Sequence, residues 1–141
     1  MTSTSLPSPE PEILPEVRPF WSAAAEGRLV IPRCNDCESW IWYPRAFCPK
    51  CYSTDVAWNE VSGRGSIYTY SVVRRGHDAY RPATPYVLAY VELDIGLRII
   101  TNIVDYDAQH LRIGAPVRAV FTATEAGNAL VRFTPVVDDA R

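Results

Sequence analysis

Four cysteines in the first half of the chain are the residues best suited to chemistry. They form two C-x2-C pairs separated by ten residues, at Cys34, Cys37, Cys48 and Cys51. Zn²⁺ prefers four tetrahedral ligands with Zn–S distances of about 2.3 Å, and a two-residue gap lets both sulfurs of a pair reach one ion from a tight turn. The spacing therefore predicts a zinc ribbon with one zinc ion per chain, in which each pair forms a knuckle.

Two other uses of paired cysteines fit the sequence less well. Disulfide frameworks are typical of secreted proteins, but residues 1–16 contain neither a basic region nor an apolar run that would direct export. A redox C-x-x-C of the thioredoxin type would open a helix after a strand, whereas these pairs flank a β-like segment. Because four thiolates close the coordination shell, we expect the zinc to be structural. Because residues 1–16 lack features that direct export, we expect a cytoplasmic protein.

Few residues remain for catalysis once the cysteines are assigned to zinc. The two histidines, His77 and His110, lie in predicted loops, where a lone histidine is more often solvated than catalytic. Asp78 follows His77, but adjacency in sequence does not create a catalytic dyad. We therefore predict no catalytic residue and no enzymatic activity of the chain on its own.

A polar loop over residues 74–82, with the sequence RRGHDAYRP, is the second candidate site. Its residues of interest are Arg74, Arg75, His77, Tyr80 and Arg81. Arginines can hold phosphates through charge-assisted hydrogen bonds, and a tyrosine can stack on adenine, so the loop is a candidate for binding coenzyme A or a partner protein. The alternative is a solvated hairpin tip.

The composition bounds the class of protein. The chain has 141 residues, of which 48% are hydrophobic and 21% charged, and a net charge of −2. These values suit one domain plus a small zinc lobe, and the acidic balance weighs against general binding of nucleic acid. No stretch reaches transmembrane length, so we expect no membrane contact.

The N-terminal part is expected to supply an arm, a short helix and the ribbon. Residues 1–16 contain four prolines and predict a flexible arm unless a partner orders it. Residues 17–61 form the next unit, with a helix over 19–27 and ribbon strands over 28–33, 39–44 and 56–61. Three tryptophans of this unit are candidates either for packing the ribbon on its neighbour or for contacting a partner: Trp21, Trp40 and Trp42.

Residues 62–136 carry the signals of a β-barrel. β-branched and aromatic runs predict five antiparallel strands over 66–75, 86–94, 97–104, 117–124 and 129–134. Five such strands with a long connection between the third and fourth match an OB-fold. The expected fold is therefore mainly β, with a short N-terminal helix, a rubredoxin-like zinc ribbon and an OB-fold barrel, followed by a surface tail over 137–141.

The ordered motifs resemble the zinc-ribbon and OB-fold proteins known as domain of unknown function thirty-five, which are associated with acyl-CoA metabolism. The resemblance rests on FW, GRLVIPRC, YPRAFCPKC, VSGRGSIYTYSVV, PYVLAYVELDIG and IGAPVRAVF in this order, and covers about residues 17–136. Family members commonly have glycine after the second cysteine and two prolines before the arginine. This chain has Glu38 and Tyr43-Pro44-Arg45 at those places, which affects the knuckle turn and no metal ligand.

The resemblance implies an accessory subunit that assembles with a thiolase-fold enzyme as a hetero-oligomer. Such enzymes include aldolases and thiolases of steroid side-chain or lipid degradation, and the accessory module can help to form the channel for the acyl-CoA substrate. A stand-alone acyl-CoA-binding module is the first alternative. A single-stranded nucleic-acid-binding OB-fold protein is the second, which a basic groove would favour and the acidic balance disfavours.

Overall fold

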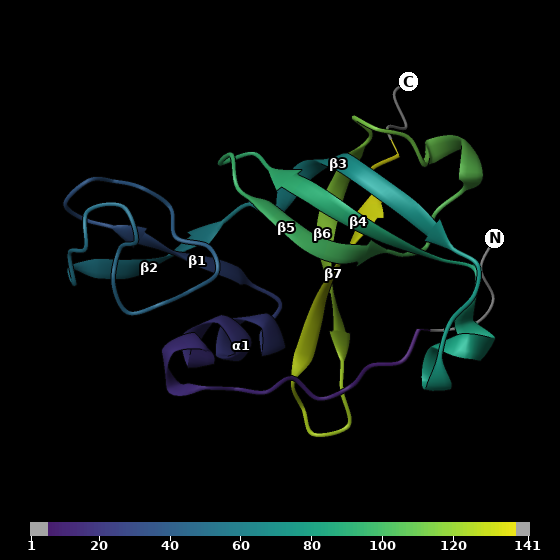
Figure 1. The fold of residues 1–141 in the computed structure, drawn as a ribbon, viewed down its shortest axis with the longest axis horizontal. Coiled ribbons are helices and arrows are strands. Elements are labelled where there is room, and N and C mark those ends of the chain that lie inside the picture. The colour runs from purple at the N-terminus through teal and green to yellow at the C-terminus, as the bar shows by residue number, and fades with distance from the viewer. Residues whose placement is uncertain (1–5, 138–141) are drawn as a thin grey trace.

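A computed structural model of the chain describes residues 6–137. Along its longest axis the two-stranded ribbon lies at one end and the barrel at the other, with the N-terminal helix beside their junction (Figure 1). The helical elements are η1 (Pro15–Val17), α1 (Arg18–Ala25), η2 (Asp78–Ala83) and η3 (Ala108–His110). The strands are β1 (Leu29–Cys34), β2 (Val56–Val61), β3 (Arg64–Val73), β4 (Tyr86–Leu93), β5 (Arg98–Ile103), β6 (Pro116–Ala123) and β7 (Ala129–Pro135).

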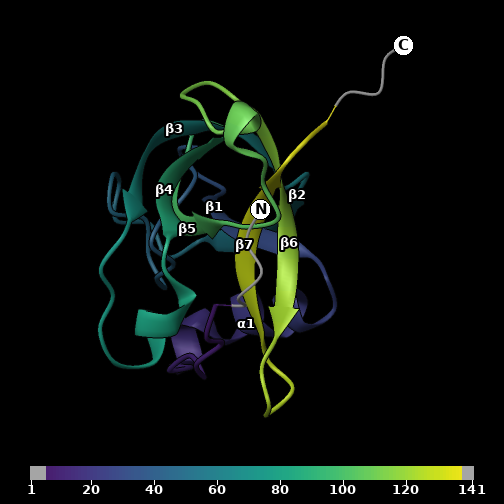
Figure 2. The same cartoon turned by 90° about the vertical axis from the view of Figure 1, so that its right-hand side faces the viewer.

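The last five strands form a closed barrel in the order β3-β4-β5-β7-β6. β3 pairs antiparallel with β4 on one side and with β6 on the other, and β5 meets β7 in parallel where Ile103 lies opposite Phe133. Figure 2 shows β3, β4 and β5 on one side of the barrel and β6 and β7 on the other. This order is that of an OB-fold, so the predicted fold class is confirmed.

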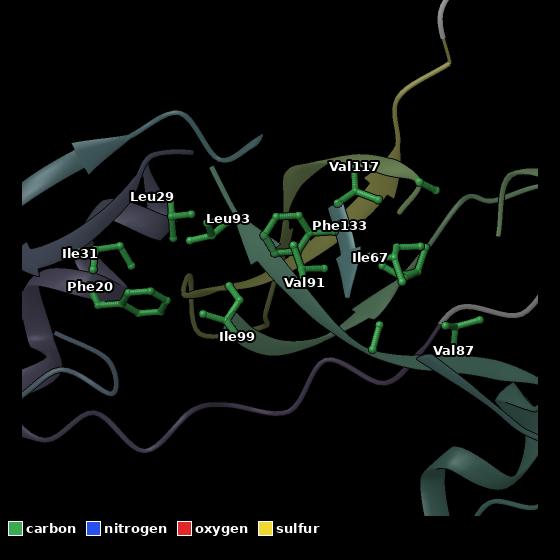
Figure 3. Packing of buried hydrophobic residues seen from close by; sticks show 13 residues of the cluster. Phe20, Leu29, Ile31, Ile67, Val87, Val91, Leu93, Ile99, Val117 and Phe133 are labelled. Atoms are coloured by element: carbon green, nitrogen blue, oxygen red, sulfur yellow. The ribbon is translucent and has the colours of Figure 1, made fainter. Parts of the chain in front are cut away.

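The barrel core follows from the alternation of side chains along the strands. Val87, Ala89, Val91 and Leu93 on β4 are all buried, and Phe133 from β7 is fully enclosed (Figure 3). Burying one such aliphatic or aromatic side chain stabilises the fold by about 1.5–3 kcal/mol. The same cluster continues into the helix and ribbon through Phe20, Leu29 and Ile31. Ribbon and barrel therefore share one hydrophobic core.

α1 has a proline in its first turn and a glycine two residues beyond its end, and both residues have the roles that the sequence predicts. Pro19 lies in the first turn, where its missing N–H leaves no intrahelical bond unmade. Gly27 has a φ of +79°, and Gly27 N–H and Arg28 N–H donate to the carbonyls of Ala24 and Ala23. Because Phe20 is buried on the barrel side, the helix is held by packing rather than by its own propensity.

The ribbon has two strands, and the third predicted strand, over 39–44, does not form. β1 pairs antiparallel with β2 from Leu29 opposite Val61 to Cys34 opposite Val56. On the other edge of β1 there is a single bridge, between Arg33 and Trp40. The knuckle turn precedes this bridge, and Pro44, which cannot donate a backbone hydrogen bond, follows it closely. The segment therefore contributes one ribbon contact and continues as a loop.

The described part of the N-terminal arm, residues 6–14, is extended and attached to the barrel. The Glu10 carboxylate accepts hydrogen bonds from Thr124 Oγ1 at 2.7 Å, Ala126 N–H at 2.9 Å and Asn128 Nδ2 at 3.0 Å. The Pro7 carbonyl accepts a hydrogen bond from the guanidinium of Arg132, whose pKa is lowered by burial. We call residues 6–14 the strap, because Figure 1 shows them crossing the foot of the β6–β7 hairpin.

The described part of the arm predicted over residues 1–16 thus has defined contacts with the barrel, which the sequence did not predict, and its flexibility stays a prediction. Residues 1–5 and most of the predicted tail, 138–141, lie outside the described residues. Within residues 6–137 no helix is long and apolar enough to cross a membrane.

Candidate functional site

The two cysteine pairs meet at the far end of the ribbon. Their four Sγ atoms lie within 4.8 Å of one another, and all four thiols are free of disulfides. Cys34 Sγ is 3.6 Å from Cys51 Sγ, and Cys37 Sγ is 3.5 Å from Cys48 Sγ. Tetrahedral ligands at about 2.3 Å from one ion would lie about 3.8 Å apart. The donor set and its spacing therefore fit a four-thiolate zinc site.

Each pair is shaped by the same turn. After Cys34, Glu38 N–H donates to the Cys34 carbonyl at 2.9 Å, and after Cys48, Tyr52 N–H donates to the Cys48 carbonyl at 2.8 Å. Glu38 and Tyr52, the residues that follow each pair, have φ values of +66° and +64°. The two knuckles are thus related copies, which lets four cysteines from separate turns converge on one point.

The thiols of the cluster respond to one another electrostatically. Hydrogen bonds with the side chain and backbone of Ser39 lower the pKa of Cys37 to about 6. At Cys51 a hydrogen bond with the Ser53 backbone lowers the pKa, but burial and the three neighbouring thiols raise it to about 12 overall. The surroundings of Cys37 thus favour the thiolate, whereas those of Cys51 favour the protonated thiol. A divalent cation among them would stabilise all four as thiolates.

The arginine-rich loop between β3 and β4 forms a cavity of about 380 Å³. Its lining residues are Arg74, Arg75, Gly76, His77, Arg81 and Thr84, and we call this the cationic pocket. β3 ends at Val73, two residues before the predicted end, which places both leading arginines in the loop. Within residues 6–137 no carboxylate lies within 4 Å of these arginines, so their charges face solvent.

The loop is folded tightly enough to hold the arginines together. Gly76 is buried, and a Cβ atom at this position would lie 2.7 Å from the Tyr80 carbonyl oxygen. Tyr80 N–H donates to the His77 carbonyl, and Thr84 Oγ1 donates to the Arg81 carbonyl, each at 2.9 Å. Tyr80 itself packs against Tyr86, with ring centroids 5.6 Å apart, and does not line the pocket. Four of the five residues predicted in this loop therefore come together.

The three candidate tryptophans lie at the junction of helix, ribbon and barrel. Each is half-buried and packs against the shared core. Trp21 and Trp42 contact Phe20 with ring centroids 5.0 and 5.6 Å away, and the Arg33 guanidinium lies 4.9 Å from the Trp40 ring. These contacts favour the packing alternative for all three. The Trp21 Nε1 atom is buried and has no hydrogen-bond acceptor among residues 6–137.

The outer face of β3, β4 and β5 is a feature that the sequence prediction missed. A groove of about 210 Å³ crosses it. The outward-facing residues that line the groove are Thr69, Ser71, Leu88, Tyr90 and Ile100. The sequence contained an indication of this groove. Residues 86–91 are apolar on both the inward and the outward face of the strand, which predicts that both faces are covered.

Comparison with known proteins follows the same division into ribbon and barrel. Residues 21–57 match the family described as ChsH2, rubredoxin-like zinc ribbon domain, and residues 58–122 match ChsH2, C-terminal OB-fold domain. A DUF35 domain-containing scaffold protein of Methanocaldococcus jannaschii is 39% identical over 94 residues, covering 66% of this chain and 67% of that protein. The chain belongs to the DUF35 family. The resemblance seen in its sequence is thereby confirmed.

Two further relatives of this DUF35 protein carry names of acyl-CoA enzymes. A probable enoyl-CoA hydratase alpha subunit of Thermomonospora curvata is 38% identical over 120 residues, and the matched region covers 84% of this chain but 37% of the relative. The chain thus spans little more than a third of that relative. The benzoylsuccinyl-CoA thiolase subunit BbsA of Geobacter metallireducens is 31% identical over 71 residues, covering 50% of this chain and 47% of the subunit.

The fold has a close counterpart among solved structures. A chain of the Ltp2-ChsH2(DUF35) aldolase superposes with a TM-score of 0.81 at 34% identity, covering 91% of this chain and 100% of that chain. A DUF35 protein from Sulfolobus solfataricus superposes with a TM-score of 0.61 at 13% identity, which shows the shared fold.

Proposed function

We propose that this DUF35 protein is a non-catalytic accessory subunit of a thiolase-like enzyme that acts on acyl-CoA. The observation that carries the proposal is its superposition over the full length of the DUF35 chain of an aldolase. The names of its relatives, which include scaffold proteins and a thiolase subunit, support the same role. We infer an aldolase or thiolase of lipid or steroid degradation as the partner. Thiols suited to metal rather than disulfides favour a cytoplasmic setting.

The residues of the chain suit assembly better than catalysis. The four cysteines are spaced for a closed metal shell, which leaves no open position for a substrate. His77 lines the cationic pocket among arginines, and the nearest acidic partner of His110 is Asp107 at 3.9 Å on the same exposed turn. We therefore assign the chemical step to the enzyme partner.

The proposed zinc ion would be held by Cys34, Cys37, Cys48 and Cys51. It would supply a crosslink between the two knuckles, whose sulfurs already converge. Because the ribbon has only Cys34, Ile41 and Cys48 as its own buried cluster, it lacks the apolar core needed for independent stability. The ion would thus hold the ribbon in the shape that packs on the barrel.

The cationic pocket is the proposed contact for coenzyme A. Arginine guanidinium groups bind phosphate oxygens through paired charge-assisted hydrogen bonds, and Arg74, Arg75 and Arg81 face one cavity with no carboxylate partner among the described residues. In the assembled enzyme this pocket would form part of the wall of the acyl-CoA channel. A stand-alone acyl-CoA-binding module is the alternative that the same pocket supports.

Purification of the tagged chain from its native host tests the accessory role. We expect a thiolase-fold enzyme to copurify in a fixed ratio, and we expect this enzyme to lose activity on acyl-CoA when the chain is removed and to regain it on re-addition. Turnover of an acyl-CoA by the purified chain alone would overturn the proposal. A monomer that binds acyl-CoA without any copurifying enzyme would support the stand-alone module.

The variant Arg75→Ala/Arg81→Ala tests the phosphate contact. Because a hydrogen bond to a charged group contributes about 1.5–3 kcal/mol, loss of two arginines should weaken CoA binding by at least about tenfold and reduce its dependence on salt. Titration calorimetry measures both effects. Arg45→Ala/Arg112→Ala removes two exposed arginines outside the pocket and should bind CoA as the unmodified protein does. Equal weakening in both variants would indicate a general charge effect and remove the pocket from the proposal.

A further inference from the structure

The groove on the outer face of the barrel is built by residues that lie side by side across three strands. In the register of the sheet, Ser71 is opposite Leu88, Thr69 is opposite Tyr90, and Tyr90 is opposite Ile100. Their neighbours Val87, Ala89 and Val91 point into the barrel and are buried. By the two-residue period of a strand, the groove residues therefore share the outward face.

This outward face is more apolar than the outward face of a sheet that is exposed to water usually is. Leu88, Tyr90 and Ile100 expose 41%, 45% and 58% of their surface, and no charged side chain lines the groove between them. Outward positions of an antiparallel sheet are ordinarily polar when they face water. A contiguous apolar strip of this kind marks a surface that another molecule covers.

Charged groups lie beyond both ends of the strip. At one end Arg98 pairs with Glu92 at 3.5 Å and stacks over the Tyr68 ring at 3.9 Å, so its charge is already matched within the chain. At the other end β3 continues from Ser71 through Val73 into the arginines of the cationic pocket, which have no carboxylate partner within residues 6–137. At about 3.3 Å per residue, Arg74 follows Ser71 by about 10 Å. The groove and the pocket are therefore neighbours along β3, and Val72 and Val73 lie between them.

β4 connects the same two features from the other side. Thr84, which precedes this strand, lines the cationic pocket, and Leu88 and Tyr90 line the groove. β4 and β5 are the second and third strands of the barrel, and the pocket loop joins its first and second strands. OB-folds bind elongated ligands across the face of these strands and beside this loop. The surface thus changes from cationic to apolar within a few residues of β3 and β4.

We propose that the groove holds the pantetheine and acyl portion of an acyl-CoA whose phosphates bind the cationic pocket. This inference rests on the proposed CoA contact and adds the residues that would recognise the rest of the molecule. The matched ligand is polyanionic at one end and apolar at the other. Leu88, Tyr90 and Ile100 would contact the acyl chain. The hydroxyls of Thr69 and Ser71 would form hydrogen bonds with the amides of the pantetheine arm.

A series of thioesters separates the groove from the pocket. The zinc-loaded chain is titrated with CoA and with acetyl-, butyryl-, hexanoyl- and octanoyl-CoA by calorimetry. Full burial of a methylene corresponds to about a fourfold gain in affinity, so a half-open groove should give about twofold per methylene. Arg75→Ala/Arg81→Ala should weaken every ligand by a similar factor and preserve this gain.

The variant Ile100→Ser tests the groove directly. It should bind CoA within about twofold of the unmodified protein but lose most of the gain with chain length, and Leu88→Ser should behave alike. Ile113→Ser is the matched control, because Ile113 is 68% exposed and lies in a turn outside the groove. Circular dichroism confirms that each variant retains its fold.

The outcomes distinguish this inference from the proposed function. If the unmodified protein binds neither CoA nor its thioesters, both the CoA contact and the groove assignment fail. If CoA binds but affinity is independent of chain length, or if the gain survives in Ile100→Ser, the groove assignment alone fails. If Ile100→Ser keeps the full thioester profile and loses the copurifying enzyme, the face is a protein interface and the inference is overturned.

Discussion

Glu38 occupies a backbone conformation that ordinary side chains rarely adopt. Its φ of +66° lies in the left-handed region, where a Cβ atom costs about 1–2 kcal/mol and glycine costs none. Its carbonyl accepts a hydrogen bond from Arg33 Nε at 2.9 Å and its N–H binds the Cys34 carbonyl, so the conformation is fixed by the knuckle. The side chain is exposed, and the knuckle depends on the backbone alone.

Glu38→Gly should therefore stabilise the zinc-loaded protein by about 1 kcal/mol, after part of the relief of strain is offset by the greater entropy of unfolded glycine. Chemical denaturation measures the change in free energy of unfolding. Glu125→Gly is the control, because Glu125 is exposed in the β6–β7 hairpin with negative φ, and this change should destabilise slightly. A loss of stability in Glu38→Gly would show that its side chain contributes to the fold.

The tryptophans show what residue type alone could and could not predict. Their number and position pointed both to packing and to a partner surface, and the fold shows the packing contacts with Phe20 and the shared core but does not test contact with a partner. The cysteines were predictable because two ligands per turn is a local geometry. The pairing of Tyr80 with Tyr86 was not, because it depends on how the loop over 74–85 closes.

At the scale of elements, the barrel strands and the ribbon strands β1 and β2 were predictable, and the predicted ribbon strand over 39–44 was wrong. β4 and β5 alternate buried and exposed positions over their whole length, which fixes both their existence and their register. The segment 39–44 has the same aromatic character but lies between a knuckle turn and Pro44, so it makes only the Trp40 bridge. Local constraints on the backbone outweighed the composition of this segment.

The strap is an element whose attachment no local pattern could predict, because Glu10 binds residues more than a hundred positions away. Hydrogen bonds from Asn128, Thr124 and Ala126 lower the pKa of Glu10 below its ordinary value of 4.5. A lowered pKa in the folded state means that the contribution is complete above about pH 4.5 and is lost as the pH falls through the folded-state value.

We therefore expect the strap to detach in acid before the barrel unfolds. Hydrogen exchange of residues 6–14 and of the β6–β7 hairpin should accelerate as the pH falls below 4.5, relative to exchange in β4. Glu10→Gln should show fast exchange at neutral pH and a much weaker pH dependence. Glu12→Gln, which changes an exposed residue outside this contact, should behave as the unmodified protein does. Identical protection in Glu10→Gln and the unmodified protein would contradict the role of the carboxylate.

In the whole molecule, the stability of the metal site and that of the barrel depend on each other through shared packing. The ribbon lies at one end of the longest axis and the β3–β4 loop, which carries the cationic pocket, lies toward the other end (Figure 1), whereas Phe20, Leu29 and Ile31 join the ribbon and the barrel in one core. The cysteine cluster and the cationic pocket are thus far apart, although the ribbon and the barrel that carry them are packed together. Zinc loss should consequently affect surfaces near the ribbon more than the groove on the outer face of β3, β4 and β5.

Cys48→Ser tests this coupling. The variant removes a buried thiolate from the closed shell, so it should lose zinc, order in the ribbon and binding to the enzyme partner together, with a marked fall in Tm. Zinc content, Tm and copurification are measured on the same preparation, and chelated unmodified protein with zinc restored serves as the control. CoA binding should persist, because the cationic pocket belongs to the barrel. Partner binding that survived zinc loss would show that the barrel alone makes the contact, and the ribbon would then serve folding rather than assembly.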